Sequence, residues 1–277
     1  MSVVYTKAVM RQMLIKDSLL CVGLDPDLKK IPTFFHRSSE EETVLHFLKS
    51  VVDVTINHCC SYKVQKAFFD TLTGGHCVLV DLIKYIKKCD PTFPIMLDCK
   101  IGDIDNTMSV YFQNVFELIC ADAVVLNPYM GDEVFELLQN YSGKTGVVLV
   151  RTSNAGSSIV QDQILANGKP FWLEILELTL TRWSEYGNLM PILSSTVADK
   201  FYSQARETIP DQMPILLAGF GAQGGQTSML RGLLNSQGIG VLINSSRGVL
   251  FPNGINSTLS DIESAAISTK LQINQGR

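Results

Sequence analysis

The stretch PIMLDCKIGDIDNT, residues 94–107, joins a short apolar run to a group of charged side chains at its end. A short apolar run bounded by polar residues is typical of a buried strand. Asp98 and Lys100 are two positions apart, so both project from the same face if the strand is extended. The stretch therefore indicates one strand–helix unit that carries charge where the strand ends.

Similar runs recur along the whole chain and predict seven further strands, at 19–25, 61–69, 123–128, 146–152, 190–195, 213–219 and 240–246. Segments with helical spacing lie between them, including 40–58, 78–89, 107–120 and 171–183. Strands that alternate with helices predict a parallel sheet, and near-continuous apolar strands indicate a sheet covered on both faces. Eight such units close readily into a barrel, so we predict a single α/β domain over residues 1–277, a (β/α)8 TIM barrel.

The composition excludes several classes of protein. Hydrophobic residues make up 46% and charged residues 18%, and the net charge of −4 disfavours nonspecific binding to nucleic acid. The seven cysteines form no CxxC pair, so we expect buried, reduced thiols, and no zinc or other metal site. Charges interrupt the first 18 residues and no apolar run reaches about 18 residues, so we expect no signal peptide, no membrane span and a cytoplasmic location.

Polar and glycine residues follow most of the expected strands. In a barrel the carboxyl ends of all strands meet at one mouth, where active sites lie. The groups that should converge there are Asp25, then Asp98 with Lys100 and Asp103, then Arg151 to Ser153, then 221–225, then Ser246 to Gly248.

The second expected strand adds a lysine to this mouth. Lys63 and Gln65 share one face of that strand and Lys66 takes the other, so we predict that Lys63 points inward. Two lysines and two carboxylates could also form a stabilising cluster without chemistry. Buried ion pairs are, however, a costly way to stabilise a fold, which favours a functional role.

Two glycine-rich stretches indicate a place for a phosphate, LLAGFGAQGGQT at 216–227 and LINSSRGVLFP at 242–252. Glycines let backbone N–H groups approach a ligand, and barrel enzymes often bind phosphate after strands seven and eight. Arg247 adds a cation of bidentate geometry. Simple turn chemistry would explain either glycine loop alone, but two together with an arginine favour a phosphate site.

These stretches resemble the orotidine monophosphate decarboxylase family. DCKIGDIDNT is similar to the family's Asp-x-Lys-x-x-Asp-Ile-x-x-Thr signature. Matching blocks of its longer-chain branch are KVQKAFFD, ADAVVLNPYMG, RTSNAG, GFGAQGG and NSSRG. The resemblance covers about residues 19–252 and implies a barrel that converts orotidine 5'-monophosphate to UMP and CO2 without a cofactor, within pyrimidine biosynthesis.

The resemblance also implies roles for individual residues. Lys63, Asp98, Lys100 and Asp103 should form an alternating charged array, with Lys100 as the catalytic cation. The family takes the second aspartate from a partner subunit, so a homodimer is implied in which Asp103, Ile104 and Thr107 cross to the other site. The implied substrate-binding residues are Asp25 at a ribose hydroxyl, Ser153 at the pyrimidine, and Gln223, Ser246 and Arg247 towards the phosphate.

Two rival functions stay open on the sequence. A sister barrel decarboxylates a sugar-acid phosphate with Mg2+ and shares the Asp-x-Lys-x-x-Asp pattern; it would need a further acidic ligand, for which Asp70 is the candidate. A non-catalytic nucleotide-binding barrel is the other rival. The polar stretch 154–169 is long for a barrel loop and is interpreted either as a mobile cover or as an insertion with a short helix.

Overall fold

Eight parallel strands close into a barrel in the computed structural model, which describes residues 4–195, 199–219 and 227–277. Each strand pairs with its neighbours in sequence order, and β1 pairs with β8 to complete the ring. The predicted fold class is therefore confirmed. The strands are β1 (Leu20–Leu24), β2 (Ser61–Gln65), β3 (Ile95–Ile101), β4 (Ala123–Leu126), β5 (Thr145–Leu149), β6 (Asn188–Ser194), β7 (Ile215–Ala218) and β8 (Val241–Ser245).

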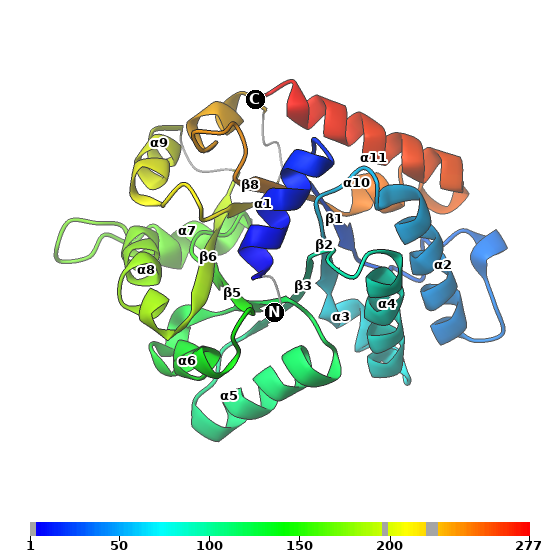
Figure 1. The fold of residues 1–277 in the computed structure, drawn as a ribbon, viewed down its shortest axis with the longest axis horizontal. Coiled ribbons are helices and arrows are strands. Elements are labelled where there is room, and N and C mark those ends of the chain that lie inside the picture. The colour runs from blue at the N-terminus through cyan, green and yellow to red at the C-terminus, as the bar shows by residue number, and fades with distance from the viewer. Residues whose placement is uncertain (1–3, 196–198, 220–226) are drawn as a thin grey trace.

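Most of the helices surround the strands on the outside of the ring (Figure 1). The helices of the described residues are α1 (Tyr5–Ile15), α2 (Glu40–Thr55), α3 (Lys66–Phe69), α4 (Gly75–Cys89), α5 (Asp105–Phe112), α6 (Glu133–Glu136), α7 (Ser158–Gln161), α8 (Phe171–Leu180), α9 (Asp199–Thr208), α10 (Arg247–Leu250) and α11 (Leu259–Asn274). A π-helical segment, Gln113–Leu118, continues α5. Shorter 3-10 turns lie at Thr33–Phe35, Pro128–Met130, Leu137–Asn140, Ala155–Ser157, Trp183–Tyr186, Thr227–Gly232 and Gly254–Asn256.

The two longest helices begin with side-chain caps. The Ser39 hydroxyl accepts a hydrogen bond from the Glu42 amide at the start of α2, and three glutamates occupy the first turn. At α11, Thr258 and Asp261 form a reciprocal capping box. Such caps satisfy free amides, and acidic residues in a first turn interact favourably with the helix dipole.

The expected strand at 61–69 was too long. The strand ends at Gln65, and the next four residues form α3. Phe69 is buried, so its apolar character serves packing of this short helix rather than continuation of the strand. An apolar run of this length cannot by itself separate strand from helix.

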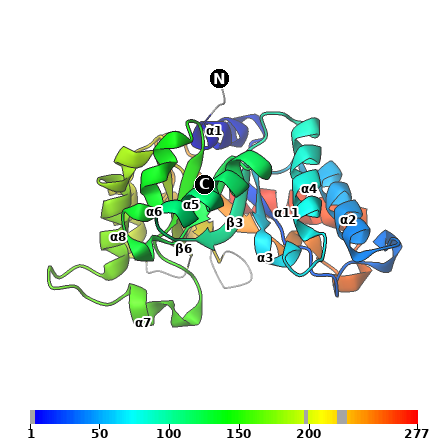
Figure 2. The same cartoon turned by 90° about the horizontal axis from the view of Figure 1, so that it is seen from below.

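The two ends of the barrel differ. Helix α1 lies across the amino ends of the strands, where the Tyr5 hydroxyl bonds the Ser61 hydroxyl at 2.9 Å. Figure 2 shows α1 and α7 on opposite sides of the molecule. Because α1 covers one end, the opposite end, formed by the carboxyl ends of the strands, is the one that can hold a site.

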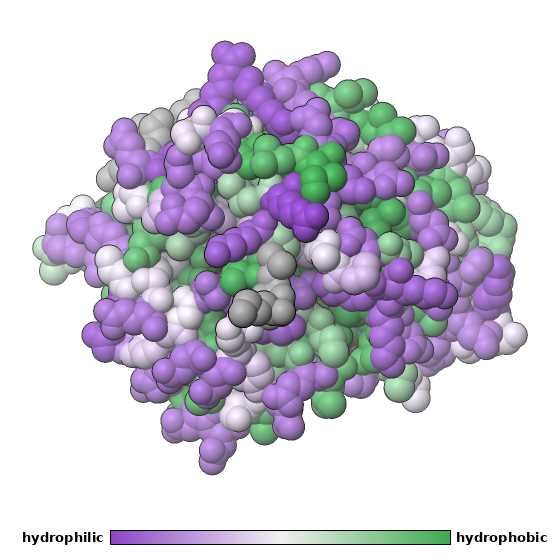
Figure 3. Space-filling view, in the orientation of Figure 1, coloured by the Kyte–Doolittle hydropathy of each residue, from purple (hydrophilic) through white to green (hydrophobic). Residues whose placement is uncertain are grey.

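The face on the α1 side of the barrel is a mosaic of hydrophilic and hydrophobic side chains, as Figure 3 shows. Within 4–195, 199–219 and 227–277, no helix combines the length and apolar character that a bilayer span requires.

Candidate active site

A buried ion pair joins β2 and β3 at the carboxyl ends of the strands. The Lys63 ammonium lies 2.7 Å from one carboxylate oxygen of Asp98. The Asp98 residue is only 3% exposed. Lys66 instead points to the rim and pairs with Asp70 at 2.5 Å. The strand alternation thus predicted the correct inward lysine.

Lys100 binds the other oxygen of Asp98, also at 2.7 Å. Its side chain is 47% exposed, so Asp98 joins an inner lysine to one that faces the solvent at the mouth. The strand is not extended here, because Lys100 has φ +46° and the pairing of β3 with β4 is irregular between Leu97 and Ile101. The two side chains meet, as the prediction of a shared face requires, but Lys100 reaches Asp98 from an irregular part of β3 rather than from a regular extended strand.

The buried charges of Asp98 and Lys63 are both held in the ionised form. Burial favours the neutral form of Asp98, but the neighbouring Lys63 and Lys100 outweigh it and hold the pKa of Asp98 below its ordinary 3.8. Burial likewise lowers the pKa of Lys63, but Asp98 and then Asp25 outweigh it and leave the pKa above 10.5. The stabilisation from Asp98 is lost as pH falls through its lowered pKa, and that from Lys63 as pH rises through its raised pKa. Around neutral pH both contributions are complete.

Replacing Asp98 by alanine should destabilise the fold strongly. Lys63 would stay buried without a partner, which costs about 3–5 kcal/mol. Asp70→Ala is the matched control, because it breaks a lysine–aspartate pair at the exposed rim and should cost no more than about 1 kcal/mol. Urea unfolding measures both free energies. Equal losses would contradict the importance of the buried pair.

Asp103, Ile104 and Thr107 do not join this cluster within one chain. The Asp103 carboxylate accepts a hydrogen bond from the Ile104 amide at 2.8 Å, and no ion pair links it to Lys63 or Lys100 among the described residues. Ile104 is 40% exposed and Thr107 is also exposed. All three lie at or near the start of α5, at the molecular surface.

A second part of the mouth is a cleft of about 540 Å³ between β1 and β8. Asp25, Ser246 and Arg247 line it, together with the backbone of Gly219 and Gly248. Arg247 is exposed, and no carboxylate among the described residues lies within ion-pair distance of it. The cleft thus presents a cation that has no acidic partner in the described structure.

The packing of this cleft requires glycine in β1. A Cβ at Gly23 would lie 1.9 Å from the Ser246 hydroxyl, so any larger residue would displace Ser246. Ser246 in turn accepts a hydrogen bond from the Asn244 amide at 3.3 Å. One side-chain oxygen of Asp25 and that of Asn244 are buried without a hydrogen-bond partner. Buried polar atoms of this kind usually find a donor, and a bound ligand or water can provide it.

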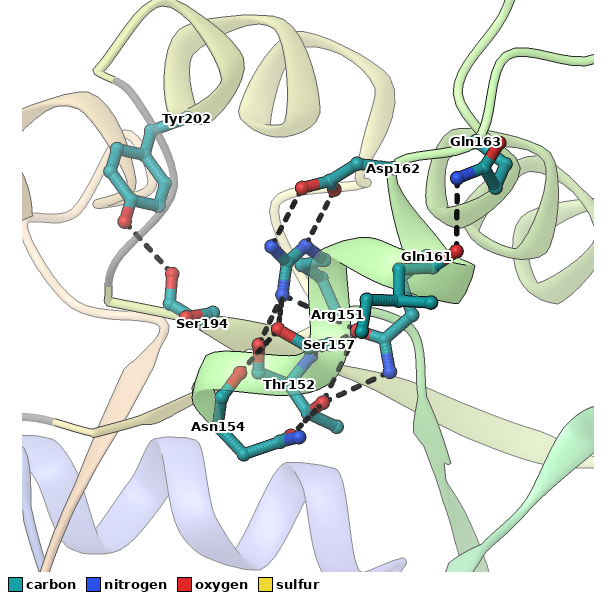
Figure 4. A network of polar contacts seen from close by, with 10 residues as sticks. Arg151, Thr152, Asn154, Ser157, Gln161, Asp162, Gln163, Ser194 and Tyr202 are labelled. Carbon is teal, nitrogen blue, oxygen red and sulfur yellow. Dashed lines mark hydrogen bonds and ion pairs between the residues drawn. The ribbon is translucent and has the colours of Figure 1, made fainter.

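The residues after β5 include Arg151, which the sequence places at the mouth without indicating a specific contact for it. Arg151 is 7% exposed and binds the Asp162 carboxylate with two parallel hydrogen bonds of 2.8 and 2.9 Å. Figure 4 shows how this pair joins a network of polar contacts around Thr152, Ser157 and Gln161. Ser153, the expected pyrimidine contact, is partly buried within this segment. The stretch 154–169 contains the short helix α7, as one of its two interpretations predicted.

Gln223 and Asp70 are the remaining site residues that the sequence suggested. Gln223 lies outside the described residues, as do the glycines of 221–225. Asp70, the candidate metal ligand of the rival enzyme, lies after α3 rather than on β2 and is paired with Lys66. The described parts of the chain contain no group of three or more histidine, cysteine or acidic side chains placed to hold a metal ion.

Comparison with known proteins identifies the family of the chain. Residues 18–252 match the model of the orotidine 5'-phosphate decarboxylase / HUMPS family. The chain belongs to this family. A protein from Cellvibrio japonicus named orotidine 5'-phosphate decarboxylase is 34% identical over 94% of each chain. One of the same name from Porphyromonas gingivalis is 33% identical over 97% of this chain and 96% of its own.

Solved structures agree with the family assignment. The structure of Leishmania donovani OMP decarboxylase is similar with a TM-score of 0.82 and 27% identity. The match covers 100% of this chain and 99% of that one. The similarity therefore extends over the complete barrel rather than over an isolated motif.

Proposed function

We propose that this chain decarboxylates orotidine 5'-monophosphate (OMP) to UMP and CO2. The observation that carries the proposal is the pair of lysines bound to opposite oxygens of Asp98, at the barrel mouth that also holds the Arg247 cleft. The family and the names of relatives that match nearly end to end support the same activity. It is a step of pyrimidine biosynthesis.

Lys100 is the centre of the proposed chemistry. The bond between C6 of the pyrimidine and its carboxyl carbon breaks, CO2 leaves, and the electron pair stays on C6. An ammonium group fixed beside C6 stabilises this negative charge because it is oriented before the reaction begins. Lys100 then donates a proton to C6, which gives UMP.

The remaining charges hold this ammonium in place. Asp98 fixes Lys100 through the 2.7 Å contact, and Lys63 fixes Asp98 from the other side. Asp25 receives a ribose hydroxyl at its buried unpartnered oxygen. Arg247 and Ser246 hold the phosphate, with Gln223, and Ser153 contacts the pyrimidine. Binding energy at the phosphate, remote from C6, serves to position the ring.

A spectroscopic assay tests the proposal. The absorbance of OMP should fall when the purified protein is added, and the rate should be unchanged in EDTA. Loss of OMP turnover in EDTA would contradict a reaction without a metal. If OMP did not turn over at all, turnover of a sugar-acid phosphate with Mg2+ would favour the sister reaction, and turnover of neither substrate would favour a non-catalytic nucleotide-binding barrel.

The proposal includes a homodimer in which Asp103, Ile104 and Thr107 complete the site of the other subunit. Its support is that these residues are at the surface and that Asp103 has no ion pair with the lysines of its own chain among the described residues. Val110 and Tyr111, which follow on α5, are 64% and 41% exposed. Large apolar side chains beside an incomplete charged array fit a contact with a second copy. A cytoplasmic location is also proposed, since all seven cysteines are free thiols, although Cys77, Cys89 and Cys120 are exposed rather than buried as expected.

Mixing two inactive variants tests the shared site. Lys100→Ala and Asp103→Ala should each be nearly inactive alone. A heterodimer has one site that carries both substitutions and one site that carries neither, so mixing should restore turnover. Mixing Lys100→Ala with Lys63→Ala, whose residues would belong to the same chain's site, is the control and should restore nothing. Failure of the first mixture, with subunit exchange demonstrated, would contradict a site built from two chains.

A further inference from the structure

The segment 152–162, which leaves the barrel after β5, has almost no apolar attachment. Ser157 is its only buried residue. The two large apolar side chains of α7, Ile159 and Val160, are 73% and 55% exposed. Apolar burial therefore cannot fix the position of this segment, which lies on the side of the molecule opposite α1 (Figure 2), and polar contacts must do so.

Those polar contacts converge on Arg151. Its guanidinium binds Asp162 at the far end of the segment through both the Nε and Nη2 groups. The Nη1 group donates to the backbone carbonyl of Thr152 and to the Ser157 hydroxyl. One buried side chain at the end of the strand thus binds the beginning, middle and end of the segment (Figure 4).

Gln161 adds a second link across the same loop. Its side-chain oxygen accepts a hydrogen bond of 2.9 Å from the Thr152 amide, and its amide group donates to the Thr152 hydroxyl at 2.9 Å. Ser153 follows Thr152 directly, so its backbone is held on one side by these contacts. On the other side, the Asn154 carbonyl accepts hydrogen bonds from the amide and hydroxyl of Ser157.

We infer that Arg151 and Asp162 are positioning residues for the nucleotide: their bidentate pair docks the segment 152–162 and so holds Ser153 at the barrel mouth. The inference rests on the proposed function, since it gives Ser153 a pyrimidine to contact. An arginine guanidinium is suited to docking the segment because it donates several hydrogen bonds from one rigid plane. A lysine would supply the charge without the geometry.

The expected consequence is a change in substrate affinity more than in chemistry. If the segment is docked in only a fraction of molecules, the apparent dissociation constant rises by the inverse of that fraction. Once substrate is bound to the docked form, Lys100 and its neighbours are unchanged. A rise in KM should therefore exceed any fall in kcat.

Asp162→Asn is the primary test, because Asp162 is at the surface and its loss does not endanger the barrel. We expect KM for OMP to rise on the order of tenfold, with kcat changed by less than about threefold. Hydrogen exchange of the amides in 154–162 should become at least about tenfold faster, with the barrel strands unaffected. Arg151→Lys should act in the same direction. Glu177→Gln is the matched control, since it removes the 2.6 Å ion pair of Lys169 just beyond the segment.

Each outcome is decisive. Unchanged exchange in Asp162→Asn would show that the pair does not dock the segment, and faster exchange with unchanged KM would show that docking does not serve the nucleotide. An equal rise of KM in Glu177→Gln would remove the specific role of Arg151. If the wild-type protein did not turn over OMP, the proposed function would fail first and the inference with it; turnover by the wild type separates the two failures.

Discussion

Lys100→Ala is expected to remove nearly all decarboxylation while nucleotide binding stays measurable. In the proposed mechanism the ammonium of Lys100 both stabilises charge at C6 and donates the proton, and each of these effects alone is worth about 10²–10⁴ in rate. A combined fall of roughly 10⁴ or more in kcat is therefore expected. The cleft around Arg247, the proposed phosphate site, is formed by other strands, so UMP should still bind.

Two variants sharpen this test. Lys100→Arg keeps the positive charge beside Asp98, but a guanidinium hardly gives up its proton, so turnover should stay very low although the charge is retained. Lys84→Ala, on the outer helix α4, removes a lysine from an exposed pair with Asp81 and should leave turnover unchanged. Stopped-flow or single-turnover assays of OMP measure the rate of decarboxylation, and titration calorimetry measures the dissociation constant of UMP. Substantial turnover by Lys100→Ala would contradict the catalytic role proposed for Lys100.

The fold was predictable because every strand has its own local signal. All eight apolar runs became strands, and their alternation with helices leaves few topologies other than a closed barrel. The boundaries were less predictable, as the helix at Lys66–Phe69 shows, because burial against neighbouring elements decides them. Helix α1 was not identified, since its packing across the barrel depends on partners distant in sequence such as Ser61.

The charged part of the site was predictable to the extent that strand geometry governs it. Lys63 reaches Asp98 as the period of two requires. Lys100 shows the limit of that argument, because its positive φ belongs to a local irregularity with no periodic signature in the sequence. The pairing of Arg151 with Asp162 was not predicted, for a related reason. Asp162 lies 11 positions away in a loop, where no period relates the two residues.

Arg247→Ala is expected to weaken binding of the phosphorylated nucleotide by roughly 30- to 1000-fold, since loss of one partner of a charge-assisted contact costs about 2–4 kcal/mol. Arg247 is suited to this role because it is exposed in the cleft beside Ser246 and has no acidic partner among the described residues. Replacing Arg247 therefore leaves no carboxylate of the described residues without its ion-pair partner, so the stability of the fold should be little affected.

The decisive measurement compares UMP with uridine, which lacks the phosphate. Arg247→Ala should raise the dissociation constant of UMP far more than that of uridine, and the salt dependence of UMP binding should become shallower. Arg182→Ala, which removes an exposed arginine paired with Asp132, is the matched control and should alter neither constant. Equal losses for UMP and uridine would mean that Arg247 shapes the cleft in general rather than holding the phosphate. A loss confined to UMP would place the phosphate between β1 and β8, and the length of the nucleotide would then limit how far from the phosphate the ring can lie.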